Sequence, residues 1–60
     1  NAVLLGGFAA LSGLVTLEAV DHAIRAKFGG KVADANVAAA AEAYAFVKKE
    51  LEALAHVEAD

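Results

Sequence analysis

The sequence predicts an all-α stretch of three helices, and three observations support this fold class. Alanine occurs 17 times and proline not at all, and alanine favours helices whereas proline breaks them. The apolar residues of the second half recur at helical intervals of three and four positions. No segment alternates apolar and polar residues over the length of a strand, so we expect no strand in residues 1–60.

The first predicted helix covers about residues 2–11 and is apolar on nearly every side. No charged side chain occurs between Asn1 and Leu17. Asn1 is a plausible N-cap, and Ser12-Gly13 is a turn and C-cap signal. A helix that is apolar all round is normally buried all round, and 60 residues without cysteine offer little to cover it. We therefore expect residues 1–60 to be a partial domain, covered by atoms outside this sequence.

The second predicted helix covers about residues 16–28. Thr16 is a suitable N-cap, and Glu18 in the first turn suits the helix dipole. Asp21 and Arg25 are spaced to form an ion pair on the polar side, and Gly29-Gly30 closes the helix. A narrow apolar stripe runs along the other side and comprises Leu17, Val20, Ile24 and Phe28.

The third predicted helix covers about residues 32–56, although Asp34 could be an N-cap that gives a later start. Asn36 falls in the middle of its apolar stripe, so we expect its amide to bond to groups elsewhere in the domain. Tyr44 lies at the flank, and residues 57–60 are expected to fray. The apolar face comprises Val32, Ala39, Ala40, Ala43, Val47 and Leu54, with Phe46 and Leu51 at its edges.

Small residues spaced four apart predict close packing between helices, because they let two helix axes approach to about 8 Å. An alternative is a close approach to a ligand or cofactor. The pairs and stripe are Gly6 with Ala10, Ala9 with Gly13, and Ala35 with Ala39 and Ala43.

Composition argues against several classes of protein. The net charge of −3 lacks the clustered basic residues of a nucleic-acid surface. The apolar run is shorter than the roughly 20 residues of a membrane span and contains glycines. A signal peptide has a basic leading region, whereas the first basic residue here is Arg25.

No residue is assigned a catalytic, cofactor-binding or metal-binding role. His22 and His56 match no local metal motif. Ser12 and Thr16 have no base in reach and are explained by turn and capping roles, and Gly6-Gly7 lacks the residues of a phosphate loop. Acid–base catalysis requires two carboxylates held together in a cleft without water. Nothing in the sequence suggests such a pair among Glu18, Asp21, Glu42, Glu50, Glu52, Glu58 and Asp60.

An ordered set of residues over about positions 1–48 resembles one family. The set comprises Asn1-x-Val3-x-x-Gly6, Gly13-Leu14-Val15-x-Leu17-Glu18, Ala23-Ile24, Phe28, Lys31-Val32, Asn36 and Ala43-Tyr44. It is similar to the C-terminal part of the gamma subunit, or gamma domain, of 2-oxoacid:ferredoxin (acceptor) oxidoreductases. Members of that family often have Asn-Met in place of Asn1-Ala2 and Gly-Tyr in place of Ala43-Tyr44. Their glycine-rich N-terminal motif and the rest of their α/β sheet have no counterpart in these residues.

The resemblance implies a piece of a complex that oxidatively decarboxylates pyruvate, 2-oxoglutarate, indolepyruvate or a related acid. Coenzyme A would accept the acyl group and ferredoxin the electrons, with thiamine diphosphate and iron–sulfur clusters in other subunits or domains. No cofactor is expected in this segment. Without cysteine it cannot ligate an iron–sulfur cluster through thiolates.

The resemblance also implies the segment's place and role. It would be the C-terminal helical part of a three-layer α/β domain, with its first helix against a sheet. It would act as a non-catalytic scaffold and subunit contact in the cytoplasm, inactive by itself. Its partners would be the other subunits and the remainder of its own domain, with no nucleic acid.

Two further interpretations of the sequence stay open. One is a small non-enzymatic helical module that self-associates through its apolar first helix. The other is a peripheral membrane helix.

Overall fold

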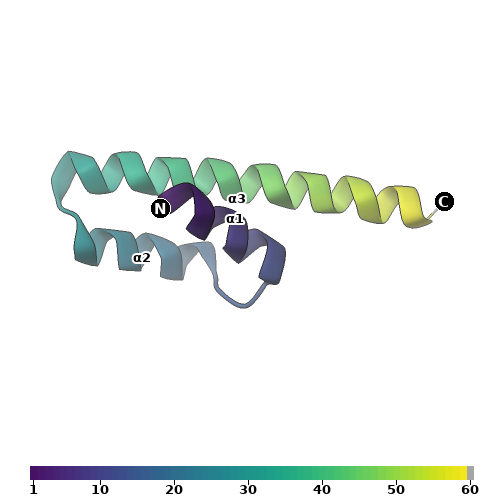
Figure 1. Ribbon diagram of the computed structural model, residues 1–60, viewed down its shortest axis with the longest axis horizontal. Coiled ribbons are helices and arrows are strands. Elements are labelled where there is room, and N and C mark those ends of the chain that lie inside the picture. Colours follow the sequence, from purple (N-terminus) through teal and green to yellow (C-terminus); the bar gives the residue numbers. More distant parts are fainter. Residues whose placement is uncertain (60) are drawn as a thin grey trace.

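The computed structural model describes the backbone of residues 1–59 and the side chains of residues 1–56. It contains three helices in this range, α1 (Ala2–Ser12), α2 (Leu17–Lys27) and α3 (Gly30–Ala59), and no strand. The predicted all-α stretch is therefore confirmed. The helices form an elongated body of 46 × 18 × 15 Å, in which α2 runs antiparallel to the much longer α3 (Figure 1).

The ends of α1 follow the predicted capping signals. The side-chain oxygen of Asn1 accepts hydrogen bonds from the backbone N–H groups of Val3, at 2.9 Å, and Leu4, at 3.4 Å. Gly13 ends the helix in the left-handed region, with φ 69°, and its N–H donates to the carbonyl of Ala9. Because a side chain is strained at that φ, glycine is the residue that suits this cap.

Helix α2 lies inside the predicted range and ends one residue early. The hydroxyl of Thr16 accepts a hydrogen bond from the N–H of Ala19 at 3.0 Å, as its predicted N-cap role requires. Phe28 is already extended, and its N–H donates to the carbonyl of Ile24. The pair Gly29-Gly30 therefore follows the helix end instead of forming it.

Helix α3 is longer at both ends than the predicted range 32–56. It begins at Gly30, so the later start at Asp34 is wrong: the Asp34 carboxylate accepts a hydrogen bond from Arg25 at 2.9 Å. The helix continues to Ala59, three residues beyond the predicted end. Asp60 and the side chain of Glu58 lie outside the described part of the chain.

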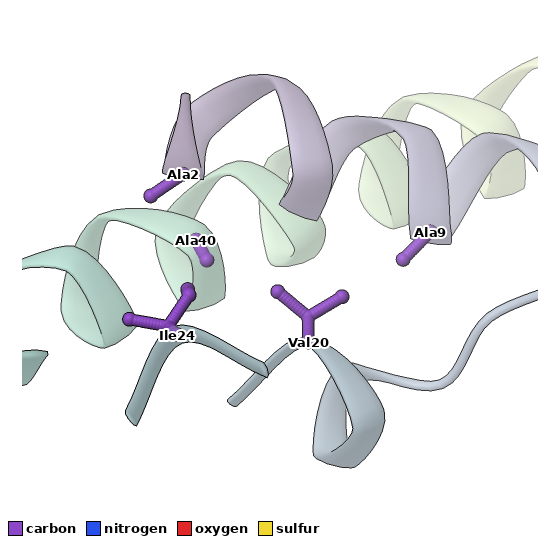
Figure 2. Packing of buried hydrophobic residues seen from close by; sticks show 5 residues of the cluster. All are labelled: Ala2, Ala9, Val20, Ile24 and Ala40. Atoms are coloured by element: carbon purple, nitrogen blue, oxygen red, sulfur yellow. The ribbon is translucent and has the colours of Figure 1, made fainter. Parts of the chain in front are cut away.

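A small core joins the three helices. Its buried cluster comprises Ala2, Ala9, Val20, Ile24 and Ala40 (Figure 2). Val37 and Tyr44 pack against this cluster. The small-residue stripe predicted on α1 is confirmed in part, since Gly6, Ala9 and Ala10 are buried. The predicted stripe of α2 is present at its centre, where Val20 and Ile24 are buried, whereas Phe28 is exposed.

The apolar face predicted for α3 is confirmed in its middle and wrong at its ends. Ala40 is buried, and Ala39, Ala43 and Val47 are half-buried, whereas Val32 and Leu54 are exposed. Ala33, which was not predicted, is buried, and Ala35, predicted in the small stripe, is exposed. The close approach of α1 accounts for the burial of Ala40, because a small residue there permits a short separation of the two helix axes.

Candidate functional site: an apolar groove between α1 and α3

A groove with a volume of about 710 Å³ lies between α1 and α3. Glu42 is the single charged residue in its lining. The helix α1 contributes Val3, Leu4, Gly7, Phe8 and Leu11, and α3 contributes Ala39, Glu42, Ala43, Phe46 and Val47.

Large side chains of this groove are open to solvent. Leu4 is 70 % exposed, Leu11 66 % and Phe46 65 %. Burying a side chain of this kind stabilises a protein by roughly 1.5–3 kcal/mol, and contiguous apolar surface of this kind marks an interaction site. Helices α2 and α3 thus leave these large side chains uncovered.

Two adjacent glycines give the groove its shape. Gly6 faces α3, where a Cβ atom would fall 2.8 Å from the carbonyl carbon of Ala40, so only glycine allows this approach. Gly7 faces the groove, where a Cβ atom would lie 3.7 Å from Cγ2 of Val47, in ordinary contact. Gly6 thus allows α1 to lie close to α3, whereas Gly7, which has no side chain, leaves space at the bottom of the groove.

A smaller pocket of about 240 Å³ lies where the start of α1 meets α2 and α3. Asn36 belongs to its lining, and the hydrogen bond that its amide makes within the described residues is a local one. Its amide donates to the carbonyl of Val32, one turn back in the same helix, at 2.7 Å. A half-buried position lets this short-range bond satisfy the amide. The lining is Asn1, Ala2, Leu5, Ala23, Ile24, Lys27, Phe28 and Asn36.

Arg25 organises the polar side of the α2–α3 contact. The predicted pair with Asp21 is confirmed at 2.8 Å, and a second ion pair joins Arg25 to Asp34 of α3 at 2.9 Å. The hydrogen bonds that Arg25 donates to Asp34 and, to a smaller extent, to Asp21 raise the pKa of Arg25 above its ordinary value. The guanidinium therefore carries a permanent charge, which suits a structural link and gives no proton for acid–base chemistry.

The remaining chemical groups do not converge on one place. His22 and His56 are exposed, and among the side chains of residues 1–56 no three His, Cys, Asp or Glu groups are placed to hold a metal ion. Ser12 accepts a hydrogen bond from the N–H of Leu14 at 3.2 Å, which is a turn role. Tyr44 packs on the core, with the Nζ atom of Lys48 5.7 Å from its ring centroid.

Sequence reasoning missed the groove because it counted apolar residues without distinguishing the sides of α1. Phe46 was expected at the edge of a buried face, yet it lines the groove. The adjacent pair Gly6-Gly7 could have indicated the groove. The two glycines lie about 100° apart on the helix, so each leaves space for a different neighbouring element.

Comparison with known proteins identifies the family. Residues 1–46 match the family described as pyruvate ferredoxin/flavodoxin oxidoreductase. The chain belongs to this family. The pyruvate synthase subunit PorC of Methanothermobacter marburgensis is 42 % identical over 48 residues, which are 80 % of this chain and 27 % of that protein. The subunit of the same name from Methanothermobacter thermautotrophicus is 39 % identical over 49 residues, 82 % of this chain and 27 % of that protein.

These matches confirm the resemblance to the gamma subunit of 2-oxoacid:ferredoxin oxidoreductases. The chain spans about 27 % of the length of the two relatives. No solved structure matches the chain. Among the described residues, no helix combines the length and hydropathy that crossing a membrane requires.

Proposed function

We propose that this chain is the C-terminal helical segment of the gamma subunit of a thiamine-diphosphate-dependent 2-oxoacid:ferredoxin oxidoreductase. In this proposal it is a non-catalytic scaffold and subunit-contact element of a cytoplasmic complex that converts a 2-oxo acid to its acyl-coenzyme A. The observation that carries the scaffold role is the groove between α1 and α3, whose lining contains one charge among ten residues.

The groove suits a packing role because its lining resembles a domain interior. Charged residues are almost never fully buried unless they are paired, and here only Glu42 would need to remain at the rim. The remainder of the same domain is the proposed cover, since the relatives are several times longer than the chain. A sheet against α1 would complete the three-layer α/β domain that the family resemblance implies.

The cofactors of the proposed reaction do not fit the groove. Thiamine diphosphate and coenzyme A carry phosphates, which proteins bind through Arg, Lys or exposed backbone N–H groups, and the groove offers a carboxylate. Iron–sulfur clusters need thiolates, and the chain has no cysteine. We therefore assign these cofactors and the ferredoxin contact to other parts of the complex.

The experiment that tests this proposal uses the whole subunit, expressed with the other subunits of its complex. Phe8→Glu places a charge in the groove, and Ala26→Glu adds the same charge at an exposed position of α2. Phe8→Glu should reduce the yield of assembled complex at least several-fold and Ala26→Glu should not. The readout is coenzyme A-dependent reduction of ferredoxin by a 2-oxo acid, per cell mass. Equal yield and activity for Phe8→Glu would show that nothing covers the groove.

The gene itself offers an independent check. The proposal requires an upstream stretch that encodes a strand and a glycine-rich turn. A natural gene that begins at or near Asn1 would contradict it.

Self-association is the second candidate function, and the same exposed groove favours it. Light scattering on the 60-residue chain separates the two: a discrete dimer or tetramer supports a self-associating module, and a folded monomer counts against it. A peripheral membrane role predicts that the chain floats with liposomes, and a chain that stays at the bottom of the gradient excludes it.

A further inference from the structure

We draw no further inference here: the strongest candidate, the apolar stripe of Val47, Leu51 and Leu54 that runs on from the groove between α1 and α3 along the last turns of α3, carries nothing because nothing in the structure shows what covers it.

Discussion

Gly6 of α1 lies directly against the backbone of Ala40 in α3. A Cβ atom on Gly6 would fall 2.9 Å from the Cα atom of Ala40 and closer still to its carbonyl oxygen. Ala40 is itself 1 % exposed. This contact sets the separation between α1 and α3. The packing of the neighbouring core residues depends on that separation.

The two adjacent glycines should respond in opposite directions to alanine. Gly6→Ala places a methyl group into the backbone of α3, so it should destabilise the subunit by about 1–3 kcal/mol. Gly7→Ala meets only a methyl group of Val47 at van der Waals distance, so it should stabilise α1 by up to about 1 kcal/mol. Thermal and urea unfolding of the whole subunit measure both changes. Equal effects of the two substitutions would show that α1 does not approach α3 in this way.

The hydroxyl of Thr16 should account for a measurable part of the stability of α2. Thr16→Ala removes the acceptor of the Ala19 N–H and should cost about 1 kcal/mol. Thr16→Asp keeps an acceptor and adds a charge that favours the helix N-terminus, so it should remain at least as stable as wild type. Urea titrations compare the three proteins, and a neutral Thr16→Ala would mean that water replaces the cap.

Asn36→Leu should have a small effect, below about 1 kcal/mol. The sequence alone predicted a loss of roughly 1–3 kcal/mol, on the assumption that the amide ties the helix to a distant group. The amide instead donates to Val32 within the same helix, and such local bonds contribute little to helix stability. A large drop in unfolding temperature would indicate that Asn36 bonds to the remainder of the domain.

Arg25→Gln should lower stability less than a core truncation such as Ile24→Ala, because both of its ion pairs are exposed. The pKa of Arg25 is higher in the folded state than in the unfolded state. The stabilisation by its ion pairs is therefore complete below the unfolded-state pKa, and it is lost only in strong alkali, as pH rises through the folded-state pKa. The loss of stability caused by Arg25→Gln should therefore not change between pH 6 and 9 through titration of the guanidinium. It should shrink in about 1 M salt, and an effect insensitive to salt would show that Arg25 acts through packing.

The features that depend on neighbouring residues were predictable from the sequence. The caps by Asn1, Thr16 and Gly13 formed as expected, because each satisfies backbone groups within three or four positions. The pair of Asp21 with Arg25 formed for the same reason. The family followed from an ordered set of residues that no single helix rule explains, and the later family match agrees with it.

The errors concern relations between helices. The sequence placed Val32 and Leu54 on the packed face of α3 because they are large and apolar. The structure leaves both exposed and buries Ala33 beside the predicted Ala40, since the position of α1 decides which part of α3 is covered. Arg25 was matched with its neighbour in sequence, and its second partner Asp34 belongs to another helix. Such choices depend on the tertiary arrangement, which periodicity within one helix does not encode.

The separation of Gly6 from Ala40 in the chain has a consequence during biosynthesis. Ala40 is added 34 residues after Gly6, and ribosomes add about 5–20 residues per second. For roughly 2–7 s the apolar first helix has been synthesised while the residue of the third helix that packs against it has not. Nascent-chain binding by a holdase should therefore begin when the first helix emerges from the ribosome, and decline once the third helix has emerged.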